Sequence, residues 1–262
     1  MIGPLRVTRD GVVAHVTLSR PDVRNAFNAE LIAELRARFE ELAELPPDEL
    51  RGVVLAGDGA SFSAGADVTW MRAAQQLSVE ENEADAGRMA AMFGAIDECP
   101  VPVITRVQGA ALGGGMGLCA VSDIVLATQD AVFGFTEVKL GILPAVISPF
   151  VVAKIGESHA RALFATGERF DAARALQIGL VHEVLADEAA LDRRIEALVA
   201  ELASAAPGAS RAAKALVRDL RGASADEARA MTTERIARMR TMPEGVEGLA
   251  AFLEKRPPSW RD

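Results

Sequence analysis

Residues 108–123, QGAALGGGMGLCAVSD, place three consecutive glycines between a predicted strand at 103–107 and a predicted helix. Because glycine has no side chain, the backbone at 113–115 can come close to a ligand. The free N–H groups and the dipole of a helix start favour a negatively charged oxygen there. A tight turn or close packing would use the same glycines, so the cluster alone leaves both interpretations open. It matches neither a P-loop nor the spacing Gly-x-Gly-x-x-Gly.

A second loop of small residues, 62–67 (FSAGAD), follows a short predicted strand at 52–56. Small residues leave backbone N–H groups accessible here too. Two such loops in one domain suggest an oxyanion hole with two donors. Each donor of such a hole contributes about 3–4 kcal/mol to stabilising the transition state.

A glutamate ends the apolar stretch 133–137 (FGFTE). If a strand continues through it, the period of two places Phe133, Phe135 and Glu137 on one face. A carboxylate among aromatic carbons is desolvated, and its pKa rises toward neutrality, which suits a general acid or base. The alternative is a solvated glutamate just beyond the strand end.

The order of predicted elements indicates the α/β class. A strand at 12–18 is followed by a helix that Asn28 would cap and that runs to about residue 44. Strands and helices then alternate through the first two thirds of the 262 residues, and the last third is mainly helical. The apolar stripe within 187–255 is typical of a core or a subunit interface.

Composition excludes several classes of function. A net charge of −9 argues against a nucleic-acid partner, and no apolar run reaches the length of about 20 residues that a membrane span needs. The N-terminus lacks the features of a signal peptide, which predicts a cytoplasmic location. Two cysteines form no disulfide framework, and three distant histidines form no zinc motif, so no metal is expected.

Taken together, these stretches resemble the enoyl-CoA hydratase/isomerase (crotonase) superfamily, in order and nearly from end to end. The stretches are 62–67, 113–115, 123–124, 133–137 and 247–256. The resemblance implies a spiral core of repeated β-β-α turns over 1–186, which carries the acyl-CoA site. It implies a helical region over 187–262 that forms a homotrimer, or a hexamer of two trimers, and completes the CoA site.

The resemblance also implies roles for individual residues. The N–H groups of Ala66 and Gly114 would hold the thioester oxygen, and Glu137 would be the acid/base. CoA would be part of the substrate, with no separate cofactor. The residues expected to contact CoA are Arg24, Ala26, Ala64, Ala66, Asp67, Val68 and Gly114, with Phe252 and Lys255 reaching its nucleotide, often from a neighbouring subunit.

One position departs from the pattern of many hydratases. They carry a first catalytic glutamate where this chain has Gly117. A single glutamate must then act twice during hydration, or a second group must share the proton transfer. Alternatively, the chain is a Δ3,Δ2-enoyl-CoA isomerase, in which one base suffices. A non-catalytic acyl-CoA-binding oligomer is a third interpretation, against which Glu137 argues.

Finer features resemble bacterial 3-methylglutaconyl-CoA hydratases of leucine breakdown and the related γ-carboxygeranoyl-CoA hydratases, in which a glycine at position 117 is usual. The stretches concerned are 113–118, 136–157, 166–172 and 244–260. Gly117 would then make room for a 3-methyl branch or a distal carboxylate, with Arg72, Arg106 or Lys139 as its cation. We therefore predict a hydratase of a branched 2-enoyl-CoA that carries a second carboxylate, such as 3-methylglutaconyl-CoA.

Overall fold

The strands of the protein form two sheets in the computed structural model, which describes residues 3–261. The larger sheet has six strands in the order β1-β2-β3-β4-β6-β9. Its first two strands are antiparallel, and all later neighbours are parallel. The strands are β1 (Leu5–Asp10), β2 (Val13–Leu18), β3 (Gly52–Gly57), β4 (Val103–Val107), β6 (Ile124–Thr128) and β9 (Glu183–Leu185).

The smaller sheet has three short strands in the order β5-β7-β8. They are β5 (Ala110–Leu112), β7 (Val132–Gly134) and β8 (Arg169–Asp171). Strand β5 is parallel to β7, which is antiparallel to β8. This sheet places the glycine cluster directly after β5.

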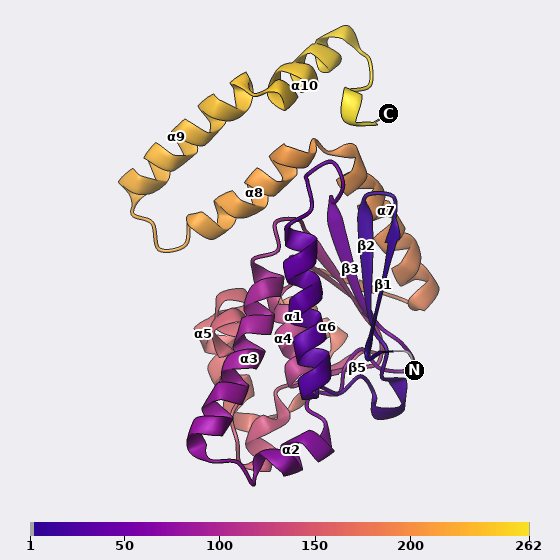
Figure 1. Ribbon diagram of the computed structural model, residues 1–262, viewed down its shortest axis with the longest axis vertical. Coiled ribbons are helices and arrows are strands. Elements are labelled where there is room, and N and C mark those ends of the chain that lie inside the picture. Colours follow the sequence, from indigo (N-terminus) through magenta and orange to yellow (C-terminus); the bar gives the residue numbers. More distant parts are fainter. Residues whose placement is uncertain (1–2, 262) are drawn as a thin grey trace.

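Helices lie on both sides of the larger sheet (Figure 1). They are α1 (Ala29–Ala43), α2 (Val68–Ala74), α3 (Val79–Asp97), α4 (Gly114–Val121), α5 (Ser148–Thr166), α6 (Ala172–Gln177), α7 (Glu188–Ser204), α8 (Pro207–Asp219), α9 (Ala225–Thr241) and α10 (Pro243–Glu254). Short 3-10 helices lie at Pro21–Val23, Thr136–Leu140 and Ser259–Arg261. Of the helices described, none is long and apolar enough to cross a membrane.

The centre of the larger sheet is buried on both faces. Along β3, Val53 and Leu55 belong to the main core together with residues of α1 and α3. Val54 points to the opposite face, where it packs with Leu191 and Ile195 of α7. This alternation follows from the period of two along a strand.

The C-terminal helices α8, α9 and α10 extend away from the core at the end opposite α2 (Figure 1). Helix α9 has no buried residue within the described chain. Helix α7, by contrast, contacts β4, β6 and β9 and packs with the core. The division of the chain at 186/187 stays a prediction.

Several sequence expectations are confirmed locally. Asn28 caps α1, because its side chain accepts a hydrogen bond from the N–H of Leu31. The predicted strand through residue 137 is wrong, since β7 ends at Gly134 and a 3-10 helix begins at Thr136. Strand β1 was not predicted, because five of its six residues are exposed and give no apolar alternation.

Candidate active site

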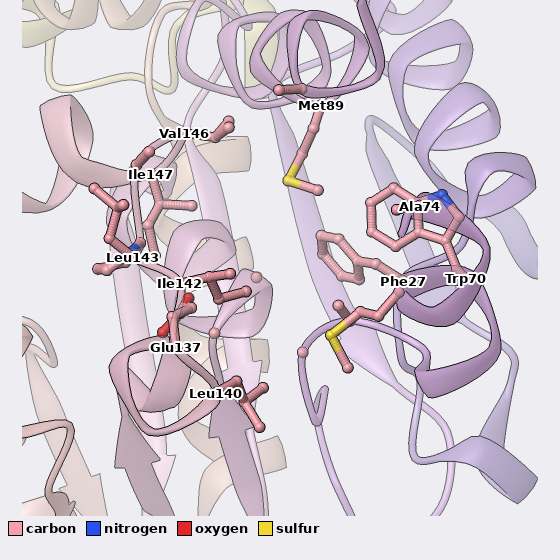
Figure 2. Close-up of a pocket in the computed structure, with 18 of the residues that line it drawn as sticks. Phe27, Trp70, Ala74, Met89, Glu137, Leu140, Ile142, Leu143, Val146 and Ile147 are labelled. Atoms are coloured by element: carbon pink, nitrogen blue, oxygen red, sulfur yellow. The ribbon is translucent and has the colours of Figure 1, made fainter. Parts of the chain in front are cut away.

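A cavity of about 550 Å³ lies between α2, α3 and the segment that follows β7. Figure 2 shows Glu137 and the residues of the 140–147 segment on one side, with Phe27 and Trp70 facing them and Met89 above. The lining is mainly apolar. Its residues are Phe27, Ala64, Gly65, Ala66, Val68, Trp70, Met71, Ala74, Asn82, Asp85, Ala86, Met89, Gly113, Gly114, Thr136, Glu137, Leu140 and 142–147.

The two glycine-containing loops touch at the floor of this cavity. A Cβ atom built on Gly113 would lie 3.6 Å from Cα of Gly65, so the two backbones are in contact. Gly113 has a φ of 49°, a left-handed conformation that favours glycine. Gly114 then begins α4, whose first N–H groups have no partner within the helix. The glycine cluster thus brings the two loops into close contact and begins a helix at the edge of the cavity.

Backbone hydrogen bonds hold the two loops in register. The N–H of Ser63 donates to Ala110 O at 3.0 Å, and the N–H of Leu112 donates to Ser63 O at 2.9 Å. Within the described chain, the N–H groups of Ala66 and Gly114 donate to no other group of the protein. Two backbone donors are therefore available at the cavity floor, as an oxyanion hole requires.

Glu137 lies beside these donors. Its Oε1 would be 3.3 Å from a Cβ atom on Gly113, and its Oε2 is buried with no hydrogen-bond partner among the described residues. Burial raises the pKa of Glu137, against a weaker opposing hydrogen bond from its own backbone. The expected aromatic desolvation by period two is wrong, because Glu137 lies in a 3-10 helix and not in β7. The surrounding cavity wall desolvates it instead.

The structure brings together five of the predicted site residues. Ala64, Ala66, Val68, Gly114 and Glu137 all line the cavity. They come from segments up to 73 positions apart, since residues 64 and 137 line the same cavity.

Asp67 plays a structural part. Its side chain caps α2 and forms an ion pair with Arg20 at 2.9 Å. Burial alone would raise the pKa of Asp67, but the hydrogen bonds from Arg20 and from the N–H of Thr69 lower it overall. It is therefore held as a charged carboxylate.

The other residues expected at the CoA site lie outside this cavity. Arg24 is exposed and Ala26 is buried, on the segment that runs along the 62–67 loop. Phe252 lies on α10 and is 76% exposed, and Lys255 caps the same helix. Figure 1 places α10 at the far end of the molecule from α2, so this single chain does not bring Phe252 to its own cavity.

The hypothesis that Gly117 makes room for substrate is wrong. A Cβ atom there would lie 2.4 Å from Cγ2 of Ile147 and 2.6 Å from Cζ of Phe93. These protein side chains already fill the space above Gly117, which does not line the cavity. The proposed cations do not line it either: Arg106 pairs with Glu188 and Asp192, and Arg72 and Lys139 are exposed.

Sequence reasoning did not identify several lining residues. Asn82, Asp85, Ala86 and Met89 line one side of α3 at spacings of three, four and seven. That spacing was a usable signal for a helix face, although it could not show that the face borders a cavity. Phe27 and Trp70 carried no such signal.

Comparison with known proteins defines the class. Residues 8–262 match the family described as enoyl-CoA hydratase/isomerase. The chain belongs to this enzyme family, and its mixed α/β fold with a helical C-terminal region is the expected crotonase-like fold.

Individual relatives cover nearly the whole chain. A Mus musculus protein named enoyl-CoA hydratase domain-containing protein 2, mitochondrial, is 32% identical over 256 residues, which cover 95% of this chain and 84% of the relative. The structure of an enoyl-CoA hydratase from Shewanella pealeana has a TM-score of 0.93 and 40% identity, covering 98% of this chain and 96% of the other. Pseudomonas aeruginosa AtuE has a TM-score of 0.95 and 36% identity, covering 99% and 100%.

Proposed function

We propose that this protein is an enoyl-CoA hydratase that adds water across the 2,3-double bond of a 2-enoyl-CoA. The observation that carries the proposal is the buried, partner-free Oε2 of Glu137 at a cavity floor where the N–H groups of Ala66 and Gly114 are available. The names of similar proteins support the same reaction.

The reaction follows from this arrangement. The thioester oxygen accepts hydrogen bonds from Ala66 and Gly114, which draws electrons from the double bond toward that oxygen. Glu137 takes a proton from water while the water oxygen bonds to C3, and the thioester becomes an enolate. Glu137 then returns this proton to C2, and the enolate collapses to the product. One carboxylate thus serves first as base and then as acid.

The filled space at Gly117 favours a second candidate function. Phe93 and Ile147 occupy the space beside Gly117, where many hydratases carry their first glutamate. Glu137 is the carboxylate placed next to Gly113 in the described structure. A single base is sufficient for a Δ3,Δ2-enoyl-CoA isomerase, in which Glu137 would remove a proton from C2 and return one to C4. A non-catalytic acyl-CoA-binding protein would have no use for a desolvated carboxylate at this place.

The acyl group is proposed from the lining of the cavity. A branched acyl chain is compatible with apolar neighbours such as Phe27, Met89 and Ile147. The diacid 3-methylglutaconyl-CoA of leucine breakdown would bring a distal carboxylate, and a buried charge requires a partner. Among the described lining residues none is Lys or Arg, whereas Asp85 and Glu137 are acidic. We therefore favour a neutral branched or linear acyl chain over the diacid.

The assembly is proposed to be a homo-oligomer, a trimer or a hexamer, in the cytoplasm. Helix α10 exposes apolar side chains that a second copy would cover, namely Val246, Leu249, Phe252 and Leu253. Such packing would allow Phe252 and Lys255 to reach the CoA nucleotide in a neighbouring subunit.

The deciding experiment follows the loss of enone-thioester absorbance with crotonyl-CoA, a neutral branched 2-enoyl-CoA and 3-methylglutaconyl-CoA. Hydration by the wild type that disappears in Glu137→Gln supports the proposal. If the wild type hydrates none of the three but converts a 3-enoyl-CoA, the protein is the isomerase. Tight CoA binding without either reaction identifies the binding protein.

A further inference from the structure

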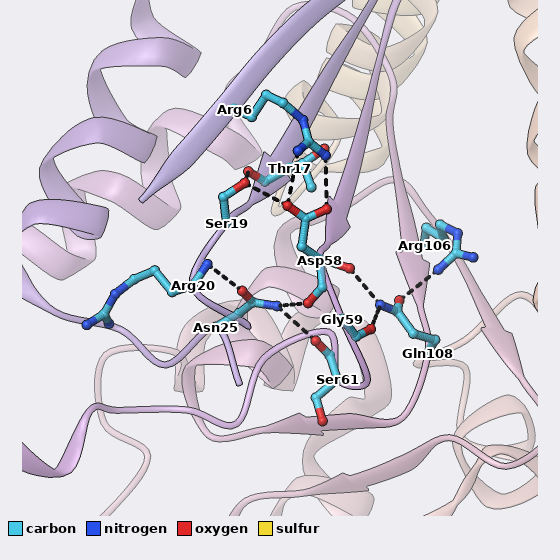
Figure 3. A network of polar contacts seen from close by, with 11 residues as sticks. Arg6, Thr17, Ser19, Arg20, Asn25, Asp58, Gly59, Ser61, Arg106 and Gln108 are labelled. Carbon is cyan, nitrogen blue, oxygen red and sulfur yellow. Dashed lines mark hydrogen bonds and ion pairs between the residues drawn. The ribbon is translucent and has the colours of Figure 1, made fainter. Parts of the chain in front are cut away.

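Asn25 is a fully buried polar residue next to the site, and no step of the proposed reaction uses it. Its Oδ1 accepts a hydrogen bond from the N–H of Arg20 at 2.9 Å. Its Nδ2 donates to Asp58 O and to Ser61 O, both at 2.9 Å. Figure 3 shows this amide between the segment after β2 and the loop after β3.

The backbone around Asn25 extends these contacts toward the cavity. The Oγ of Ser63 donates to Asn25 O at 2.9 Å. On either side of Asn25, the N–H of Ala64 donates to Arg24 O at 2.9 Å, and the N–H of Phe27 donates to Gly65 O at 2.7 Å. Residues 24–27 are therefore joined to residues 61–65, which lead directly into Ala66.

The position admits few substitutes. Asn25 has a φ of 53°, a left-handed conformation that asparagine tolerates better than most residues. A Cβ atom on Gly57 would lie 2.8 Å from Nδ2 of Asn25, so the amide is packed directly against β3. A fully satisfied buried network of this kind makes its surroundings rigid.

A second amide holds the same loop from the other side without reaching the oxyanion donor. Nε2 of Gln108 donates to Gly57 O at 2.6 Å and to Gly59 O at 3.0 Å (Figure 3). Its Oε1 accepts a hydrogen bond from Nη1 of Arg106 on β4 at 2.9 Å, which leads away from this loop. Asn25 and Gln108 also bind the loop through their main-chain O. Gln108 O accepts from the N–H of Phe62, whereas Asn25 O accepts from Oγ of Ser63, which lies closer to Ala66.

We propose that Asn25 is a positioning residue for the oxyanion donor at Ala66, acting through Ser61 and Ser63. This inference rests on the proposed function, because it takes the N–H of Ala66 as a donor to the thioester oxygen. A displacement of about 1 Å at a reacting group can reduce the rate about 100-fold, so a shift of this loop is sufficient to impair catalysis.

The test compares Asn25→Asp with Thr105→Val. Aspartate keeps the size and the acceptor for Arg20, but it replaces the Nδ2 donor with a carboxylate oxygen facing two carbonyls. Thr105 is equally buried, and its hydroxyl lies 2.5 Å from that of Ser122, so its loss removes a buried contact away from the cavity. Melting temperatures show how far each variant is destabilised.

Two readouts separate positioning from loss of stability. In Asn25→Asp, kcat with crotonyl-CoA should fall about 10–100-fold while KM changes by less than about threefold. The absorbance of bound cinnamoyl-CoA, which moves to longer wavelength when its carbonyl accepts hydrogen bonds, should lose most of its shift. Thr105→Val should keep both the kcat and the shift of the wild type.

Equal kcat and equal spectral shift in a folded Asn25→Asp and in Thr105→Val would overturn the inference. If Asn25→Asp does not fold, Ser63→Ala provides the test, with an expected loss of about tenfold in kcat and a reduced shift, and unchanged values overturn it. A wild type that shifts cinnamoyl-CoA but hydrates nothing refutes the hydratase, and the spectral comparison then still decides on Asn25. A wild type that binds cinnamoyl-CoA without a shift refutes both.

Discussion

Gly113 and Glu137 lie against each other at the cavity floor, since a Cβ atom on Gly113 would stand 3.3 Å from Oε1 of Glu137. The missing side chain lets the carboxylate approach the start of α4. Charge that develops on a thioester oxygen at Gly114 would therefore form close to the group that moves the proton. The following predictions depend on this arrangement.

Replacing Glu137 with glutamine should reduce kcat about 100- to 10,000-fold, the usual contribution of a general acid/base. The melting temperature should stay the same or rise, because Oε2 has no partner to lose. Enone absorbance and thermal denaturation measure the two effects. As a control, Glu168→Gln changes an exposed carboxylate outside the cavity lining and should leave kcat unchanged. Full activity of Glu137→Gln would assign the proton transfer to another group.

The activity should depend on the ionisation of Glu137. Hydration needs its carboxylate form, and burial raises its pKa from 4.5. We therefore expect kcat/KM of the wild type to fall as the pH decreases through this raised value. A profile that stays flat down to pH 4.5 would contradict the assignment.

The raised pKa of Glu137 also affects the stability of the protein, and here its effect is unfavourable. A raised pKa in the folded state means that folding disfavours the charged form, so Glu137 lowers the free energy of unfolding above its folded pKa. This penalty disappears below pH 4.5. The stability advantage of Glu137→Gln over the wild type should thus be larger at pH 8 than at pH 4.5, as measured by urea denaturation. An advantage independent of pH would show that the carboxyl is solvated.

Gly117→Ala should destabilise the protein by about 1–3 kcal/mol through overpacking against Ile147 and Phe93. Gly87→Ala is the matched control, because it also lies within a helix but a Cβ atom there meets nothing within 4 Å. That control should stabilise by about 0.4–1 kcal/mol. Urea denaturation compares the two. Equal changes in the free energy of unfolding for the two substitutions would mean that Phe93 and Ile147 move aside at little cost.

Leu249→Glu should convert the proposed oligomer to smaller species, because Leu249 belongs to the exposed apolar face of α10. Val79→Glu is the control, since Val79 is 78% exposed at the start of α3. Helix α3 lies away from α10 in Figure 1. Light scattering after size exclusion measures the mass of each variant. An unchanged mass for Leu249→Glu would place the subunit contact elsewhere.

Short-range features of this chain were accessible without a structure. The cap at Asn28 and the strand-glycine-helix order at 103–121 depend on neighbouring residues, and both are present in the structure. The resemblance of separated motifs indicated the family. The strand through Glu137 failed because residue alternation alone could not reveal that the chain turns after Gly134.

The sequence by itself determined the α/β class and the family, because these follow from local periodicity and from motifs in order. Only the tertiary structure decided that Gly65, Gly113 and Glu137 meet. It also decided that Phe93 and Ile147, and not a substrate, occupy the space beside Gly117. The physical reason is that contacts between residues tens of positions apart depend on how the helices pack. In a close-packed interior, a sequence pattern does not show which side chains fill a given space.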